Sequence, residues 1–164
     1  MRDTDDEQQG ISGGSDDRAL AVEFARQRPA DVRAQIAAAY ALDRVGDEHG
    51  ALRFYTRAWR LGVPDDARRA FLVGYGSTLR NTGRVAESVR VLRQAVEAYP
   101  ESHALTAFLA LSLHTAGRYR EAFARLMGSA LDAARPDGFD GFERALRAYQ
   151  AELATDDAGP QPRP

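Results

Sequence analysis

The chain has 164 residues, of which 44% are apolar and 28% charged, and its formal net charge is −2. This length and apolar fraction suit a single domain with a continuous core. The absence of Cys excludes disulfides, thiolate metal sites and thiol nucleophiles. All 22 basic residues are Arg, which together with the abundant Ala is typical of GC-rich coding and indicates a bacterial source.

The charge and hydropathy of the first residues predict where the protein resides. They are acidic and lack the basic start and apolar stretch of a secretory signal, and no apolar run in the chain is long enough to span a membrane. The sequence therefore predicts a cytoplasmic protein with no membrane partner. With the acidic ends set aside, the remaining chain is mildly basic, far from the concentrated charge of a dedicated nucleic-acid binder.

The N-terminal region divides into a tail and a helix. Residues 1–14 are rich in Asp, Gln, Gly and Ser, so they cannot offset the entropy cost of ordering, and a disordered acidic tail is predicted. A helix is expected from about Ser15 to Arg28, where Pro29 ends it. We interpret residues 15–30 as a partial leading repeat that supplies an extra N-terminal helix.

Three copies of a helix-turn-helix pattern follow, over residues 31–65, 66–101 and 102–136. Their turn glycines, Gly46, Gly83 and Gly117, are spaced by 37 and then 34 residues. Each glycine stands where a helix must end in a left-handed conformation that a side chain would oppose. Asp31, Asp66 and Ser102 are the expected helix starts, and a proline closes each copy.

Small residues at fixed offsets from each turn predict how the two helices of a copy pack. The pairs Ala39 with Ala51, Gly76 with Ser88, and Ala110 with Ala122 allow close helix approach. Larger residues at the flanking positions, Tyr55, Leu92 and Leu126, are expected to fill the sides. Each hairpin buries only part of its apolar surface alone, so stability is expected from stacking against neighbours.

The C-terminal region repeats the division into helix and tail. Phe139, Phe142, Leu146, Tyr149 and Leu153 are spaced by 3, 4, 3 and 4 residues, which predicts an amphipathic helix over residues 138–154. We interpret it as a capping helix with one face on the last repeat; docking of a partner helix is the alternative. Residues 155–164 are proline-rich and are predicted to be disordered.

Over residues 15–154 these copies resemble the tetratricopeptide repeat (TPR), a helix-turn-helix unit of 34 residues. The resemblance implies an all-α fold: a right-handed helical solenoid of three repeats between an N-terminal helix and a C-terminal capping helix. It also implies a non-catalytic adaptor or scaffold that binds a peptide or a partner segment in a concave groove lined by the first helices. It leaves the partner, the pathway and the oligomeric state open.

The resemblance places the groove on first-helix residues that the packing pattern does not use. We expect Tyr40, Phe108 and Leu111 to anchor an apolar segment and Arg44 and Arg80 to pair with acidic groups. The alternative is that Tyr40 and Phe108 fill the gaps between adjacent repeats. The acidic tail itself is a further candidate occupant, lying against Arg44 or Arg80. The expected groove residues are Arg33, Ile36, Tyr40, Arg44, Val73, Ser77, Arg80, Asn81, Phe108, Leu111 and His114.

Signals for catalysis or cofactor binding are weak. The three His residues lie far apart without a metal-ligand motif, and no metal site, cofactor or enzyme activity is predicted. The glycines at positions 74 and 76 suggest a phosphate loop only superficially, because no strand precedes them. Paired carboxylates such as Asp65 and Asp66 fall at helix starts, where acids stabilise the positive end of the helix dipole.

A row of arginines provides the alternative function. Arg53, Arg57 and Arg60 share one helical face, Arg90 and Arg93 another, and Arg68 and Arg69 lie between them. A convex basic stripe of this kind could contact phosphates in a nucleic-acid-contacting regulatory protein. Nearby acids and the absence of interleaved exposed aromatics favour a solvated face instead.

Overall fold

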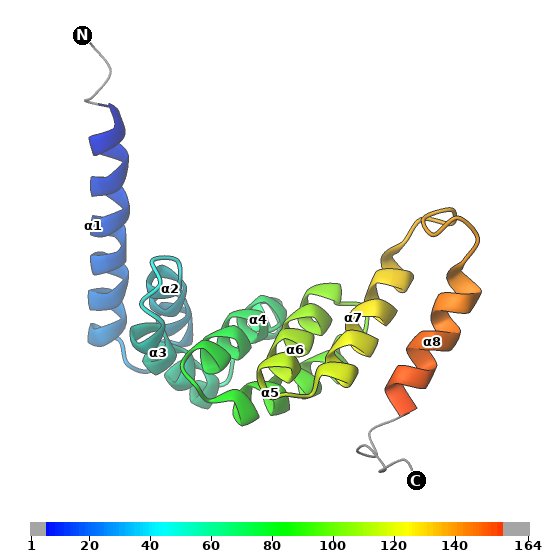
Figure 1. The fold of residues 1–164 in the computed structure, drawn as a ribbon. Coiled ribbons are helices and arrows are strands. Elements are labelled where there is room, and N and C mark those ends of the chain that lie inside the picture. Colours follow the sequence, from blue (N-terminus) through cyan, green and yellow to red (C-terminus); the bar gives the residue numbers. More distant parts are fainter. Residues whose placement is uncertain (1–5, 156–164) are drawn as a thin grey trace. The chain divides into compact units, whose positions relative to one another are not determined.

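The computed structural model describes the backbone of residues 6–155 and the side chains of residues 16–155. Within these residues the secondary structure is entirely α-helical, which confirms the predicted fold class (Figure 1). The helices are α1 (Asp6–Gln27), α2 (Val32–Asp43), α3 (Glu48–Leu61), α4 (Asp65–Asn81), α5 (Val85–Ala98), α6 (His103–Thr115), α7 (Tyr119–Ala133) and α8 (Glu143–Thr155).

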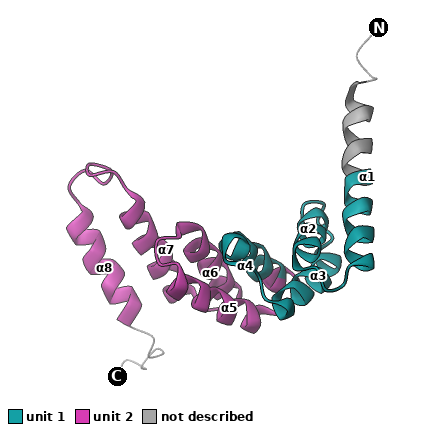
Figure 2. Cartoon of the chain, turned by 180° about the vertical axis from the view of Figure 1, so that it is seen from behind, with its two compact units in different colours: residues 1–78 teal, residues 79–164 magenta. Residues whose placement is uncertain are grey.

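The helices fall into two compact units, residues 1–78 and residues 79–164 (Figure 2). In unit 1, α1 packs against α2 and α2 packs against α3. In unit 2, α5 packs against α6, α6 against α7, and α7 against α8. The chain passes from unit 1 to unit 2 within α4.

The helix boundaries follow from capping residues and turn glycines. The Asp31 side chain accepts hydrogen bonds from the backbone N–H groups of Arg33 and Ala34, and the Ser102 hydroxyl accepts one from Leu105. These bonds satisfy N–H groups that have no partner inside the helix. The turn glycines have positive φ angles of 78° at residue 46, 82° at residue 83 and 77° at residue 117. The predicted left-handed turns are therefore confirmed.

An aromatic cluster around a half-buried carboxylate forms the core of unit 1. Tyr55 and Phe71 are fully buried, and their rings meet edge to face with centroids 5.4 Å apart. The Tyr55 hydroxyl donates to Asp43 Oδ2 at 3.0 Å, and the Thr78 hydroxyl lies 3.3 Å from Asp43 Oδ1. These bonds join α2, α3 and α4 through one side chain.

Unit 2 buries leucines and small side chains instead. Leu79, Leu92 and Leu113 are fully buried. Ser88 of α5 and Ser112 of α6 are also fully buried, and their hydroxyls lie 2.8 Å apart. The small residues predicted at close helix contacts are buried in both units, because a larger side chain would force the helices apart.

Two predicted boundaries differ from the structure. Helix α1 begins at Asp6, inside the segment predicted to be disordered, since extending an existing helix costs less than nucleating one. Helix α8 begins at Glu143 rather than at residue 138. Asp140 and Gly141 have φ angles of 52° and 83°, which a continuous right-handed helix cannot contain. Residues 1–5 and 156–164, most of the remaining predicted tails, lie outside the described residues.

The large apolar residues predicted at the flanking positions of the repeats and on the capping helix are only partly buried. Tyr55 and Leu92 are fully buried as expected, whereas Leu126 is half-exposed. Helix α8 packs on α7, but none of its residues is buried. Phe142 and Tyr149 are 66% and 61% exposed, so the predicted capping face leaves much of its apolar surface open.

Candidate functional site: an apolar surface on α6 and α7

The first-helix residues predicted in unit 1 have different environments on α2. Arg33 is exposed, and its Nη2 donates to both carboxylate oxygens of Asp66 at 3.1 and 2.9 Å. Ile36 is buried and presents little surface to a ligand. Tyr40 is half-buried, and its ring meets the Tyr55 ring with centroids 6.0 Å apart. Arg44 is exposed just after α2 ends.

Four predicted residues lie on α4, two in each unit. Val73 and Ser77 of unit 1 are half-buried. In unit 2, the Arg80 guanidinium donates through Nε and Nη2 to Asn81 Oδ1 at 3.1 and 2.9 Å. The Asn81 amide oxygen therefore already accepts hydrogen bonds from one edge of the Arg80 guanidinium.

The predicted residues of the third repeat form the most open set. Helix α6 contains no Asp, Glu, Lys or Arg, and Leu111 is 49% exposed on it. His114 is exposed one turn further on, and Phe108 is half-buried. The His114 ring meets the Tyr119 ring of α7 edge to face, with centroids 4.9 Å apart.

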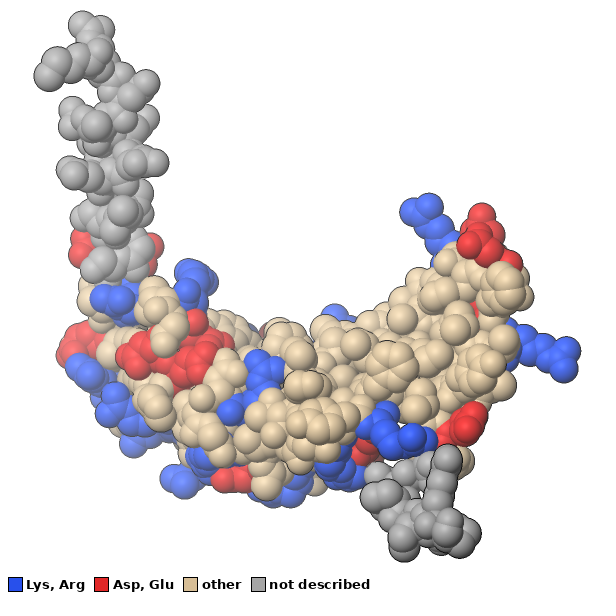
Figure 3. All heavy atoms as spheres, viewed as in Figure 1, with Lys and Arg blue, Asp and Glu red and all other residues tan. Residues whose placement is uncertain are grey.

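Helix α7 adds apolar residues that the sequence analysis did not assign to a site. Tyr119, Phe123 and Leu126 are 61%, 58% and 49% exposed, at spacings of four and three residues that place them on one helix face. The ring contact between His114 and Tyr119 joins this face to Leu111. We call Leu111, His114, Tyr119, Phe123 and Leu126 the α6–α7 apolar surface. Figure 3 shows a wide area without charged side chains over this part of unit 2.

Tyr55 is the described residue whose pKa is raised most strongly, and its role is structural. Burial raises the pKa of Tyr55, and the nearby Asp43 carboxylate raises it further. The pKa of Tyr40 is also raised, by burial and then by Asp43. A phenol held neutral among buried rings donates a hydrogen bond and has no access to a substrate. The perturbation therefore indicates core packing rather than acid–base chemistry.

The predicted arginine stripe separates into two kinds of residue. Arg53, Arg57 and Arg60 are exposed on α3, and none forms an ion pair with a described residue. By contrast, Arg93 crosses from α5 to the Glu121 carboxylate of α7 at 2.7 Å. Arg68 donates to the backbone carbonyl of Val63 at 2.8 Å. An unpaired basic face therefore remains on α3 alone among these positions.

Metal-ligand clusters and membrane-spanning helices are both absent from the described residues. No group of three or more His, Cys, Asp or Glu side chains between residues 6 and 155 is placed to hold a metal ion. Among the helices of that same range, none combines the length and the apolarity needed to cross a bilayer.

Comparison with known families agrees with the repeat pattern. The family model described as Tetratrico peptide repeat matches residues 32–153, from the first residue of α2 to the last turn of α8. A search of curated proteins finds no match. The matched segment contains all three turn glycines and the helical hairpins that they join. The chain therefore belongs to the tetratricopeptide repeat family.

Proposed function

We propose that this chain is a non-catalytic adaptor or scaffold that binds a peptide or a partner segment through first-helix residues and the adjoining face of α7. Tetratricopeptide repeats generally mediate protein–protein interactions and are typically non-catalytic. The observation that carries the proposal is the α6–α7 apolar surface. Exposed aromatic and aliphatic side chains of this density mark interaction sites on soluble repeats, because burying them against a partner is favourable.

The third repeat is the proposed centre of binding. Leu111 and Phe123 are large and exposed, and they lie on adjacent helices. A partner residue that covered them would remove apolar surface from water. Each Å² removed would stabilise the complex by about 25 cal/mol. The first-helix residues of unit 1, Tyr40 and Arg44, are proposed as secondary contacts. We keep the cytoplasm as the proposed compartment.

Site-specific photo-crosslinking in cells of the source organism tests this proposal. A photoreactive residue placed at position 111 or 123 is expected to trap the same partner protein. The matched control places it at Leu61, which is 41% exposed on α3, outside the surface. Phe123→Glu is expected to abolish the adduct at position 111 while the protein stays folded. Equal trapping from position 61, or none from any position, would contradict the proposal.

The unpaired arginines of α3 support a second candidate, contact with nucleic acid. Arg53, Arg57 and Arg60 lie on one helix face and are all exposed. Binding through them is expected to weaken steeply with salt, whereas binding through the apolar surface is not. If the only captured material is nucleic acid that high salt releases, and Arg57→Gln reduces its capture, this candidate replaces the first.

A further inference from the structure

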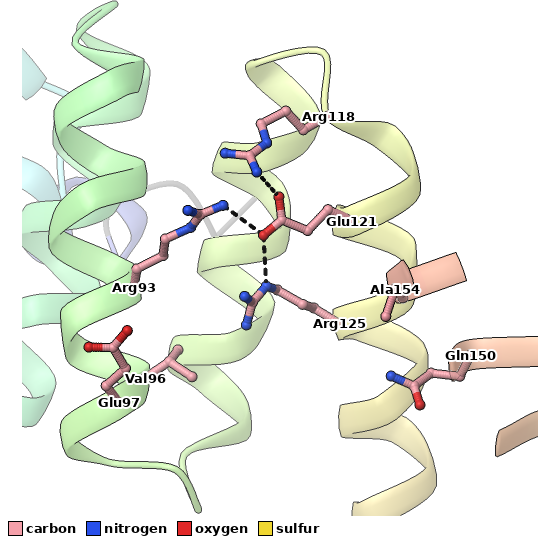
Figure 4. A pocket seen from close by; sticks show the side chains of 9 residues that line it. Arg93, Val96, Glu97, Arg118, Glu121, Arg125, Gln150 and Ala154 are labelled. Atoms are coloured by element: carbon pink, nitrogen blue, oxygen red, sulfur yellow. Dashed lines mark hydrogen bonds and ion pairs between the residues drawn. The ribbon is translucent and has the colours of Figure 1, made fainter. Parts of the chain in front are cut away.

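A pocket of about 550 Å³ lies between α5, α7 and α8 in unit 2 (Figure 4). Its volume is within the range of about 300–1,000 Å³ that is usual for ligand sites. The guanidinium groups of Arg93, Arg118 and Arg125 lie around the carboxylate of Glu121. The pocket shares helix α7 with the α6–α7 apolar surface, but none of its lining residues belongs to that surface or to the predicted first-helix set.

Three guanidinium groups converge on one carboxylate in this pocket. Glu121 Oε1 accepts hydrogen bonds from Arg93 Nη2 at 2.7 Å and Arg125 Nε at 3.2 Å. Its other oxygen lies 2.6 Å from Arg118 Nη2. The Glu121 side chain is 15% exposed, whereas the three arginines are 36–38% exposed. The acid therefore lies at the floor of the pocket, and the bases reach solvent above it.

The equivalent position of the preceding repeat shows that this cluster is not a general feature of the repeat. Glu87 stands 34 residues before Glu121. Like Glu121, it pairs with the arginine at the start of its helix, and Arg84 Nη2 lies 2.6 Å from Glu87 Oε2. Its other basic neighbour, Arg90, is 3.9 Å away, and the Glu87 side chain is 38% exposed. Glu121 thus has two further close arginines, Arg125 from its own repeat and Arg93 from the preceding one, and its carboxylate is less exposed than that of Glu87.

The pocket holds more hydrogen-bond donors than its own carboxylate can use. Arg93 and Arg125 each spend one N–H group on the same oxygen of Glu121, although a guanidinium carries five. The Arg93 Nε and Glu121 Oε2 atoms are both buried and make no hydrogen bond within the described residues, although Arg118 Nη2 lies 2.6 Å from Glu121 Oε2. With Glu97 as the other acid of the lining, three positive charges face two negative ones. A carboxylate from a ligand would accept from the remaining donors and neutralise the excess charge.

From this arrangement we infer that the α5–α7–α8 pocket binds an acidic side chain from an extended segment of a partner protein. The walls beside the arginines are apolar, from Val96, Ala124 and Ala154, and the Gln150 amide lines the α8 side. Such walls fit the methylene groups and backbone of a peptide better than a hydrated inorganic ion. Glu121 holds the guanidinium groups in place, and the incoming carboxylate pairs with their solvent-facing N–H groups.

Fluorescence anisotropy with the full chain tests the inference, using a labelled peptide of six glutamates and a matched peptide of six glutamines. The glutamate peptide is expected to bind and the glutamine peptide not to bind. Arg125→Gln is expected to weaken binding about tenfold or more, the usual effect of losing a charge-assisted hydrogen bond. The matched control Arg90→Gln removes the same charge outside the pocket and is expected to leave the affinity unchanged.

A second pair of variants tests the role of the internal acid. Glu121→Gln removes the competing carboxylate, so it is expected to strengthen binding of the glutamate peptide severalfold, whereas Glu87→Gln is not. Circular dichroism checks that each variant is folded, and Arg93→Gln replaces Arg125→Gln if that variant is not.

Three outcomes would overturn the inference: no binding by the wild-type chain, equal weakening by Arg125→Gln and Arg90→Gln, or displacement of the peptide by equimolar inorganic phosphate. Phe123→Glu is expected to keep full peptide affinity, which makes failure at this pocket distinguishable from failure of the proposed function.

Discussion

Two groups of aromatic residues, one in each unit, have opposite environments. In unit 1, Tyr55 and Phe71 are fully buried in one cluster. In unit 2, Tyr119, Phe123 and Phe142 are 58–66% exposed. All of these residues belong to segments with the same apolar spacing of three or four residues, so the spacing alone does not decide burial. A repeat residue is buried only when a neighbouring helix covers it.

Under the proposed function, this difference gives the two units different tasks. The aromatic cluster and the Asp43 hydrogen bonds stabilise unit 1, whereas the exposed rings of unit 2 are available for binding. An exposed ring contributes little to stability, which makes its role in binding separable by mutation.

Truncation of one phenylalanine in each unit gives the largest expected contrast. Phe71→Ala removes a ring that contacts three other aromatic rings, and it is expected to lower the free energy of unfolding by about 3–5 kcal/mol. Phe142→Ala is expected to change it by no more than about 0.5 kcal/mol. Urea unfolding followed by circular dichroism measures both. Similar losses would mean that the open ring of unit 2 is covered in solution.

Two helical glycines provide a second contrast, of opposite sign. A Cβ atom at Gly74 would collide with the Tyr55 hydroxyl, whereas at Gly128 its nearest neighbour is Gln150 Nε2 at 3.4 Å. Gly74→Ala is therefore expected to destabilise by about 1–3 kcal/mol. Gly128→Ala is expected to stabilise by about 0.5–1 kcal/mol, because Ala is the better helix former. Thermal melting measures both shifts.

The collision itself can be tested by removing the hydroxyl. In a Tyr55→Phe background the hydroxyl is absent, so the methyl group added at position 74 meets less of the side chain at position 55. The cost of Gly74→Ala is then expected to fall by about 1 kcal/mol or more, the usual size of a contact coupling. An unchanged cost would show that Gly74 is needed for another reason.

The regular features of this fold are predictable because they depend on nearby residues. The left-handed turn at Gly83, the N-caps at Asp31 and Ser102 and the buried Leu79 all follow from positions within one repeat. The start of α8 is not predictable in this way. Its apolar stripe begins at Phe139, but the positive φ angle of Asp140 interrupts the helix, and the stripe does not encode that angle.

The candidate sites depend on contacts between different helices, so the sequence predicts them less well. The sequence predicts Leu111 as a site residue on a first helix. The extension of this apolar surface to Tyr119 depends on the ring contact between His114 of α6 and Tyr119 of α7. Arg93 was expected on an exposed stripe and instead pairs with Glu121, 28 residues away. Gln35 replaces the aromatic residue usual in the family, and its amide donates to the backbone carbonyls of Ala25 and Arg28. Only the packed helices define these pairs.

Alkaline pH should weaken unit 1 through its buried phenol. Because burial and Asp43 raise the pKa of folded Tyr55, the unfolded chain loses this proton first. The free energy of unfolding is expected to fall above about pH 10, by up to about 1.4 kcal/mol per pH unit. Tyr55→Phe is expected to reduce this fall without abolishing it, because the pKa of Tyr40 is also raised. Urea unfolding midpoints between about pH 8 and 11 measure this fall. An identical pH dependence of the midpoint in Tyr55→Phe and in the wild-type chain would contradict the prediction.

The surface ion pair of unit 1 should have the smallest effect. The hydrogen bond from Arg33 lowers the pKa of Asp66 below its ordinary value, so this pair stabilises the fold above that value and is lost as the pH falls through the lowered pKa. NMR titration of Arg33→Gln is expected to return the Asp66 pKa toward the ordinary value. Both side chains are about two-thirds exposed, so solvent screening should leave the melting temperature nearly unchanged. A drop as large as that of Gly74→Ala would assign the stability of unit 1 to its surface charges rather than to its aromatic core.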